Sequence, residues 1–208
     1  MGIIIVLISY IIGALPIGYL LVRLIKKQDI TRIGSGRTGA TNAMRAGGLI
    51  IGILTSILDV LKGFISVWLA RWLMPDAIWL QVFAGVATIV GHNWSIWLYW
   101  LSGRFSAGAG TGPNVGAAMA FWPGIGLFVI PLVIFFVLII GYASLASVVT
   151  ALAITTLFLV RAKLLGEPLA YSIYGLMTSL VIIWALRPNI RRLLNGTERR
   201  VGLFAKKN

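Results

Sequence analysis

The sequence LIIGILTSILDVLKGFISVWLA occupies residues Leu49–Ala70 and sets the fold class of the chain. Only Asp59 and Lys62 carry charge within it. A helix needs roughly 20 predominantly apolar residues to cross the hydrocarbon core of a bilayer. The stretch therefore predicts a membrane-spanning helix that carries one pair of opposite charges.

The composition of the whole chain agrees with a membrane protein. Hydrophobic residues make up 59% of the 208 residues, charged residues make up 11%, and the mean hydropathy is +0.97. A soluble domain carries roughly 25% charged residues, so a water-soluble globule and a disordered chain are both excluded. The net charge of +13 could suggest nucleic acid, but the chain has too little polar surface to present a basic face to water. We interpret the charge as basic cytoplasmic loops and expect membrane lipids, not nucleic acid, as partners.

Several further apolar segments predict the remaining spans. The complete set is Ile3–Val22, Leu49–Ala70, Ile78–Leu101, Val115–Gly141, Leu145–Val160 and Leu169–Leu186. Pro123-Gly124 predicts a turn that divides the long segment into two, which gives about seven crossings. The N-terminus lacks the basic region and cleavage site of a signal peptide, so we expect it to form the first span. The sequence predicts a single all-α polytopic domain over residues 1–208.

Basic residues predict the orientation of the chain. Six lie in the loop Arg23–Gly48 and seven in the tail from Arg187. The positive-inside rule places both segments in the cytoplasm, with the N-terminus outside and the C-terminus inside. The segments Ser102–Asn114 and Tyr142–Ser147 then face the cytoplasm too, whereas Arg71–Ala77 and Arg161–Pro168 are external. The polar motifs therefore gather on the cytoplasmic face of the membrane.

The most informative polar stretch is GSGRTGATN, residues 34–42, followed by Arg45. Gly34 and Gly36 allow sharp turns that expose backbone N–H groups. Arg37 and Arg45 supply forked cationic donors that suit phosphate. Short polar side chains add hydrogen bonds: Ser35, Thr38, Thr41 and Asn42. The pattern favours an anion site, and the alternative is an ordinary cytoplasmic loop rich in turn residues.

Two polar features interrupt the apolar segments. Asp59 and Lys62 are three residues apart, so they share a helical face and can pair. Each costs about 2.5–3.5 kcal/mol near the bilayer centre, which argues for a partner. A structural ion pair and a catalytic role are equally open. His92, in Gly91-His92-Asn93, is more often a hydrogen-bonded structural residue than a catalyst.

Two other loops could contribute donors. Arg104, in the glycine-rich segment Ser102–Asn114, is a candidate phosphate clamp, and the absence of a preceding strand argues against a dinucleotide-binding loop. Ser144 and Ser147 lie on one face at the start of a predicted helix. Ser144 could bind substrate or simply cap that helix.

The scarcity of reactive side chains limits the mechanism. The chain contains no cysteine and one histidine, His92. Its acidic residues are scattered: Asp29, Asp59, Asp76, Glu167 and Glu198. We therefore expect no metal, no cofactor and no acyl-enzyme. Many phosphate donors with few acids and bases favour direct transfer between two phosphorylated substrates by positioning and charge neutralisation.

Taken together and in order, these motifs resemble those of the bacterial acyl-phosphate:glycerol-3-phosphate acyltransferases. The matching motifs are residues 34–42 with Arg45, Asp59–Gly63, Gly91-His92, Ser144–Ser147, and Asn189-Ile190…Leu193-Leu194…Gly196. The resemblance implies a multi-pass inner-membrane enzyme with seven spans and a cytoplasm-facing site. It also implies transfer of a fatty acyl group from acyl phosphate to the 1-hydroxyl of glycerol 3-phosphate, without metal or acyl-enzyme. The products would be lysophosphatidic acid and phosphate, as in the first acylation of phospholipid biosynthesis.

The resemblance also implies roles for individual residues. Ser35 and Arg45 match phosphate-contacting positions, with Thr41 and Asn42 beside them and Gly34 and Gly36 in the same loop. Ser144 and Asn189 match further site positions. We expect Arg104, Ser35 and Ser144 to hold the acyl phosphate, and Arg45 and Asn189 to hold the glycerol phosphate. Asp59, Lys62 and His92 would support the site.

Two positions depart from the family pattern. Ser102-Gly103-Arg104-Phe105 stands where the family has Gly-Gly-Lys-Gly, so Phe105 replaces a glycine. Leu186 stands where a histidine usually lies three residues before Asn189. These departures leave two alternatives open: a non-catalytic lipid- or anion-binding paralogue, or an acyltransferase with another acceptor. A transporter is disfavoured because the chain shows no paired, broken spans with internal symmetry.

Overall fold

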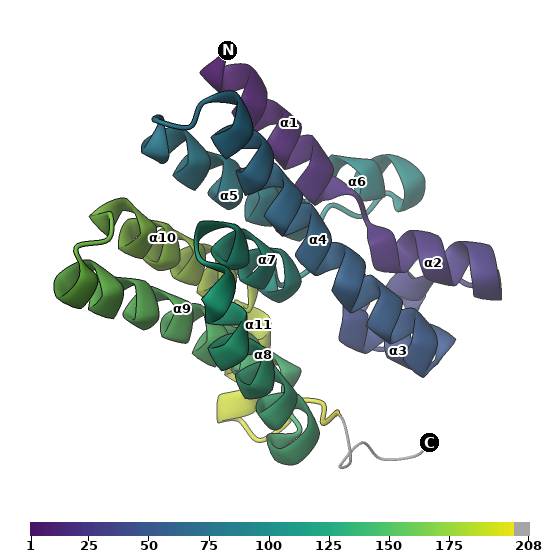
Figure 1. Ribbon diagram of the computed structural model, residues 1–208. Coiled ribbons are helices and arrows are strands. Elements are labelled where there is room, and N and C mark those ends of the chain that lie inside the picture. The colour runs from purple at the N-terminus through teal and green to yellow at the C-terminus, as the bar shows by residue number, and fades with distance from the viewer. Residues whose placement is uncertain (202–208) are drawn as a thin grey trace.

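The computed structural model describes residues 1–201 and is a bundle of helices (Figure 1). Its elements are α1 (Gly2–Ala14), α2 (Ile17–Lys26), η1 (Ile30–Arg32), α3 (Ala40–Gly47), α4 (Leu49–Leu73), α5 (Ile78–Asn93), α6 (Ile96–Ser102), α7 (Thr111–Phe121), η2 (Pro123–Ile125), α8 (Gly126–Phe135), η3 (Phe136–Ile140), α9 (Ala143–Leu165), α10 (Leu169–Ala185) and α11 (Arg187–Leu194). The predicted all-α class is confirmed. The end of the basic tail, residues 202–208, lies outside the described residues.

Four helical segments within residues 1–201 are long and apolar enough to cross a membrane. They are Gly2–Lys26, Leu49–Leu73, Pro123–Ile140 and Ala143–Leu165. A fifth is added if α10 and α11, which meet at an angle of 66°, count as one span, and α5 is a shorter apolar helix. The expected turn at Pro123-Gly124 is present as η2.

The predicted span Ile78–Leu101 is divided between two helices. Helix α5 ends at Asn93, and Trp94 leaves helical geometry with φ −128° and ψ 84°. Ser95 then begins α6, because its hydroxyl accepts a hydrogen bond from the Leu98 N–H. Serine at this position favours a new helix start over continuation of the old one.

The first predicted span, Ile3–Val22, is also interrupted. Pro16 has no N–H to continue the hydrogen-bond ladder, and α1 gives way to α2 at this point. The carbonyls left by the break find partners elsewhere: Lys62 Nζ donates to Leu15 O at 3.0 Å, and the Ser95 hydroxyl donates to Ala14 O. A buried charge in α4 thus stabilises a break in the neighbouring helix.

Helix α7 lies between α4 and α10 (Figure 1) and packs closely on α4. A Cβ added at Gly63 would lie 2.1 Å from Pro113 O, and one at Gly116 would lie 1.8 Å from Val60 O. Without a hydrophobic driving force in lipid, such backbone-to-backbone packing of small residues holds helices together. Large apolar side chains point outward instead, as Leu127 does at 80% exposure.

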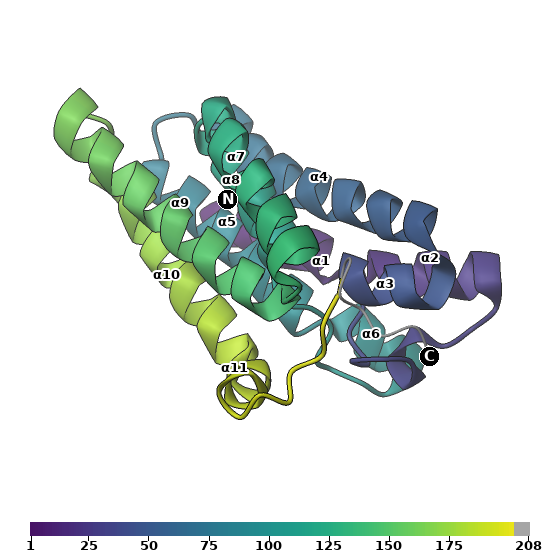
Figure 2. The same ribbon diagram turned by 90° about the horizontal axis from the view of Figure 1, so that it is seen from below.

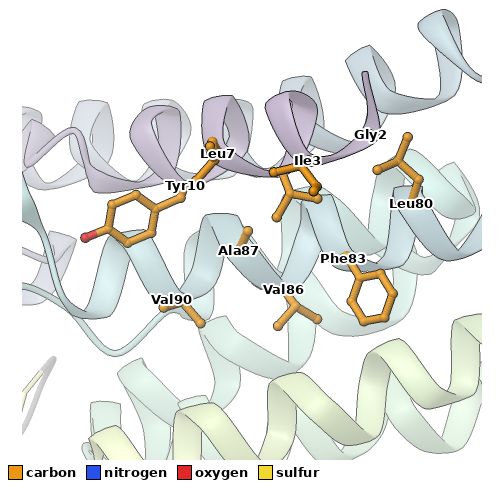
Figure 3. A pocket seen from close by; sticks show the side chains of 10 residues that line it. Gly2, Ile3, Leu7, Tyr10, Leu80, Phe83, Val86, Ala87 and Val90 are labelled. Atoms are coloured by element: carbon orange, nitrogen blue, oxygen red, sulfur yellow. The ribbon is translucent and has the colours of Figure 1, made fainter.

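Two shallow apolar grooves follow this outer surface. One, of about 550 Å³, lies between α1 and α5 and is lined by side chains that include Ile3 and Phe83 (Figure 3). The other, of about 420 Å³, lies between α8 and α9 and is lined by residues that include Leu132 and Ala153. Both offer hydrocarbon surfaces to a lipid chain.

The polar motifs gather at the end of the bundle away from the N-terminus. Helices α3, α6 and α11 lie at this end in both views, together with the extended C-terminal segment (Figures 1 and 2). The fold therefore places loops from distant parts of the sequence around one end of α4, α7 and α9.

Candidate active site

The loop at residues 34–39 is held by the buried side chain of Asn42 in α3. Asn42 Oδ1 accepts a hydrogen bond from the Ser35 N–H at 3.2 Å. Its Nδ2 donates to the carbonyls of Ile33 at 2.9 Å and Arg37 at 2.8 Å, with Ile30 O at 3.3 Å. Because Asn42 is only 3% exposed, these hydrogen bonds are shielded from water. Asn42 therefore organises the loop from inside.

Glycine conformations shape the same loop. Gly34 and Gly36 have backbone φ angles of +56° and +71°, which residues with a Cβ rarely adopt. A Cβ at Gly34 would lie 2.3 Å from Asn42 Oδ1, so the backbone and the amide are in close contact. The turn exposes Ser35, while Thr41 lies half-buried in the first turn of α3.

The second glycine-rich loop docks directly on the first. The Thr38 N–H donates to Ala107 O at 2.7 Å, and the Thr38 hydroxyl donates to the same oxygen at 3.2 Å. A Cβ at Gly36 would lie 3.2 Å from Arg104 Nη1. The Ala107 N–H donates in turn to Asn93 O at 2.9 Å, which fixes the loop to the end of α5. The two predicted phosphate-binding loops are therefore adjacent.

Exposed cations surround these loops. Ser35, Arg45 and Arg104 are all exposed, and Arg45 Cδ lies beside Gly34. Partial burial lowers the pKa of the Arg45 guanidinium, and nearby Arg199 lowers it further, whereas Glu198 opposes both effects. The neighbouring cations repel one another, so this surface favours an anionic ligand.

Arg37 lies apart from this exposed group. Its Nη2 donates to Ala185 O, at the end of α10, at 2.8 Å. Burial lowers the pKa of Arg37, and Arg192 adds to the decrease while Glu198 opposes it. Arg37, which the motif offered as a phosphate donor, therefore links the loop to the junction of α10 and α11.

The third side of the site comes from α9 and α11. The Ser144 hydroxyl donates to Glu198 Oε1 at 3.0 Å, and Asn189 Nδ2 donates to the same oxygen at 2.7 Å. Arg192 Nε donates to Glu198 Oε2 at 2.9 Å. The interpretation of Ser144 as a helix cap is wrong, because the N-cap of α9 is Tyr142 and Ser144 lies inside the helix. Its hydroxyl is free of the backbone and available to an acceptor in the site.

Asp59, Lys62 and His92 form a buried cluster separate from the exposed cations. The expected ion pair is present, with Lys62 Nζ 2.9 Å from Asp59 Oδ1. Lys62 Nζ also lies 2.8 Å from His92 Nδ1, which places that ring nitrogen as the acceptor. A Cβ at Gly108 would lie 2.0 Å from His92 Nε2, so the ring supports the second loop directly. These contacts favour the structural interpretation of all three residues.

The two departures from the family pattern have clear places in the fold. Leu186 is 1% exposed and belongs to the hydrophobic core around α7, α9 and α10. Phe105 packs edge-on against Tyr99 of α6, with ring centroids 6.4 Å apart. Leu186 thus adds apolar packing at the position where a polar ligand was expected.

Glu198, Arg192 and Arg199 also belong to the site, although none of them lies in a motif that the sequence marks as phosphate-binding. Arg199 reaches back to Gly34 O, and Glu198 is shared by α9 and α11. The one feature of the sequence that could have indicated Glu198 is that it is the single acidic residue in the strongly basic tail from Arg187. Among residues 1–201, no group of three His, Cys, Asp or Glu side chains is arranged to hold a metal ion.

Comparison with known proteins gives consistent matches over nearly the whole chain. The profile of the family described as "Glycerol-3-phosphate acyltransferase" matches residues 3–196. A glycerol-3-phosphate acyltransferase from Prochlorococcus marinus (strain NATL1A) is 36% identical over 205 residues, covering 97% of this chain and 99% of its own.

Two solved structures share the fold. Both are of PlsY (YgiH), described as an integral membrane glycerol 3-phosphate acyltransferase. The glycerol 3-phosphate form superposes with a TM-score of 0.84 at 31% identity, covering 97% of this chain and 96% of that one. The lysophosphatidic acid form superposes with a TM-score of 0.80 at 32% identity, with 97% and 95% coverage. The helical membrane fold described above is therefore shared with both.

Proposed function

The chain is a member of the glycerol-3-phosphate acyltransferase family, and we propose that it transfers a fatty acyl group from acyl phosphate to the 1-hydroxyl of glycerol 3-phosphate. The products are lysophosphatidic acid and phosphate. The observation that carries this proposal is that three groups of residues, far apart in the sequence, lie at one end of the bundle. The first is Ser35 and Arg45, the second is Arg104, and the third is Ser144 and Asn189. One domain spanning residues 1–208 would carry the activity.

The arrangement supports binding of two phosphates. Arg104 lies beside Gly36 and Arg45 beside Gly34, in the loop that carries Ser35. In the proposed arrangement Arg104 and Ser35 hold the acyl phosphate and Arg45 holds the glycerol phosphate. Ser144 and Asn189 donate to one and the same carboxylate oxygen, so their donors address a single anion. We therefore place both on one phosphate rather than on two. Guanidinium groups suit this task because their charge-assisted hydrogen bonds match phosphate oxygens.

The reaction needs little acid–base chemistry from the protein. The 1-oxygen of glycerol 3-phosphate forms a bond to the acyl carbonyl carbon, and the bond between that carbon and the phosphate oxygen breaks. The hydroxyl proton passes to a phosphate oxygen of the substrates. The arginines hold the two anions together against their mutual repulsion, which is catalysis by positioning and charge neutralisation.

The groove between α8 and α9 is a suitable binding site for the acyl chain. It includes Val149 and Ala153 on α9, the helix that also presents Ser144. A chain lying in this groove would have its phosphate end toward the site and its hydrocarbon in the bilayer.

We also propose seven crossings with the site in the cytoplasm of a bacterial inner membrane. The helices α1, α4, α5, α7, α8, α9 and α10 run alternately toward and away from the polar end (Figures 1 and 2). The basic loop before α4 and the basic α11 both lie at that end, as the positive-inside rule requires of a cytoplasmic face. The N-terminus lies at the opposite end.

The orientation can be tested because the chain has no cysteine of its own. Gln28→Cys and Asp76→Cys each place a thiol at an exposed loop position, one on either side. A membrane-impermeant maleimide should label Asp76→Cys in intact spheroplasts and Gln28→Cys only after permeabilisation. The reverse pattern would contradict the orientation.

The activity is tested by phosphate release from palmitoyl phosphate in detergent, with and without glycerol 3-phosphate. Acyl-CoA and acyl carrier protein serve as alternative donors, and glycerol and dihydroxyacetone phosphate as alternative acceptors. We expect release that depends on both acyl phosphate and glycerol 3-phosphate. A folded protein that binds these ligands without releasing phosphate would be a non-catalytic paralogue. Phosphate release that depends on a different acceptor would show that glycerol 3-phosphate is not the acceptor.

Arg45→Ala tests the placement of the glycerol phosphate. Loss of a charge-assisted hydrogen bond removes about 1.5–3 kcal/mol, so kcat/KM should fall by about 10- to 100-fold. Arg32→Ala is the matched control, because Arg32 is 84% exposed and pairs only loosely with Asp29 at 3.4 Å. Equal activity in the two variants would show that Arg45 does not bind substrate.

A further inference from the structure

The C-terminal arm, residues Thr197–Val201, carries a carboxylate into the anion site. Glu198 has a side chain only 6% exposed, although it belongs to an extended segment at the surface of the bundle. Its two oxygens accept hydrogen bonds from Ser144, Asn189 and Arg192. Two of these three donors are residues that the proposed function assigns to substrate phosphate.

The arm is attached on both sides of the site. The Val201 N–H donates to Gly141 O at 2.8 Å, and Val201 is only 3% exposed. On the opposite side, Arg45 Nη2 donates to Arg200 O at 3.0 Å, and Arg199 donates to Gly34 O. The arm thus runs from α11 across the ends of α8 and α9 toward the loop before α3 (Figure 2).

The chemistry of Glu198 matches that of the ligand. A carboxylate and a phosphate are both anions that accept several hydrogen bonds, and both suit forked guanidinium donors. Arg37 and Arg45 also lie close enough to Glu198 to interact with it electrostatically. A site built from several arginines is costly to leave without a counter-charge, and Glu198 is an acidic side chain in contact with this one.

We propose that Glu198 is an intramolecular placeholder for substrate phosphate, and that phosphate binding displaces it together with the arm. This rests on the proposed function, because it takes Ser144 and Asn189 as phosphate ligands. Displacement frees both donors at once and also releases the Arg45 side chain from Arg200 O. The arm therefore covers the site in the empty protein and opens when the site is filled.

The proposal predicts the direction of a single substitution. The apparent dissociation constant of a ligand rises in inverse proportion to the fraction of protein in the binding-competent state. Glu198→Gln keeps the size of the side chain but removes its charge, so the open fraction should increase. Inorganic phosphate and glycerol 3-phosphate should then bind about five- to tenfold more tightly.

The experiment uses the full chain in detergent, with isothermal titration of inorganic phosphate and of glycerol 3-phosphate. Glu167→Gln is the matched control, because it removes a comparable ion pair, 2.7 Å from Arg161, near the opposite end of α9. Tighter binding by Glu198→Gln alone supports the placeholder. Unchanged, weaker or absent binding by Glu198→Gln overturns it, and weaker binding would instead make the carboxylate a support for Ser144 and Asn189.

Thiol accessibility measures the displacement itself. Val201→Cys places the only thiol of the chain at a buried position in the arm, and Leu194→Cys places one at a position that is 81% exposed. Phosphate should raise the maleimide labelling rate of Val201→Cys at least threefold and leave that of Leu194→Cys unchanged. A rate that stays constant or falls overturns arm displacement.

The two proposals can fail separately. Phosphate-dependent labelling and tighter binding in a protein without acyl transfer would retain the placeholder and refute the acyltransferase. Acyl transfer in a protein whose arm stays in place would retain the acyltransferase and refute the placeholder.

Discussion

Asn42→Ala tests whether the first loop depends on one buried amide. The side chain accepts one hydrogen bond from Ser35 N–H, and its two Nδ2 protons serve the carbonyls of Ile33 and Arg37, with Ile30 O nearby. Three hydrogen bonds at about 0.5–1.5 kcal/mol each amount to about 1.5–4.5 kcal/mol. These bonds end on the loop and on the segment directly before it, so the loss should destabilise this region more than the bundle.

The expected result is a loop that no longer presents Ser35 and Arg45 together. Since 1.4 kcal/mol corresponds to a factor of ten, kcat/KM for glycerol 3-phosphate should fall at least about tenfold. The thermal unfolding midpoint in detergent should change little by comparison. Asn195→Ala is the control, because Asn195 is exposed at the end of α11. Wild-type kcat/KM in Asn42→Ala would refute the reasoning.

Two further substitutions test the buried charges and the acyl groove. Lys62→Met leaves the Asp59 carboxylate buried without its partner and should reduce the free energy of unfolding by about 3–5 kcal/mol. The double variant Asp59→Leu/Lys62→Met removes both charges and should lose less stability. Denaturation in detergent measures both losses, and equal losses would contradict the pairing. Ala153→Trp fills the groove between α8 and α9 and should reduce the transfer rate of palmitoyl groups more than that of octanoyl groups. Ala87→Trp fills the groove between α1 and α5 and should leave both rates unchanged. A larger loss of palmitoyl transfer in Ala87→Trp than in Ala153→Trp would place the acyl chain in the groove between α1 and α5.

The apolar segments predicted the helical membrane fold because the bilayer dictates the length and composition of a span. Local polar residues were harder to interpret from the sequence. Ser95 begins a new helix and Pro16 interrupts another. Distant groups satisfy the carbonyls at both breaks: Tyr10 and Ala107 donate to Trp94 O and Asn93 O at the first, and Lys62 and Ser95 donate to Leu15 O and Ala14 O at the second. Lys62 is such a group, and nothing in its own segment indicates that it also reaches Leu15 O.

The candidate site was predicted in part for a similar reason. Short motifs such as GSGRTGATN show which groups can bind phosphate, and the structure places that loop against the one carrying Arg104. The contact between Glu198 and Ser144 joins residues far apart in the sequence, and no local pattern encodes it. Leu186 likewise gives no sign in the sequence that it completes the core rather than the site.

The most direct test is a structure of the protein with glycerol 3-phosphate and a non-hydrolysable acyl phosphonate bound together. We predict that Arg45 and Arg104 each contact one of the two anions, with the Ser144 and Asn189 donors on one of them and the Glu198 carboxylate withdrawn. Anions bound away from these groups, or on opposite sides of the membrane, would contradict a single centre for two phosphorylated reactants.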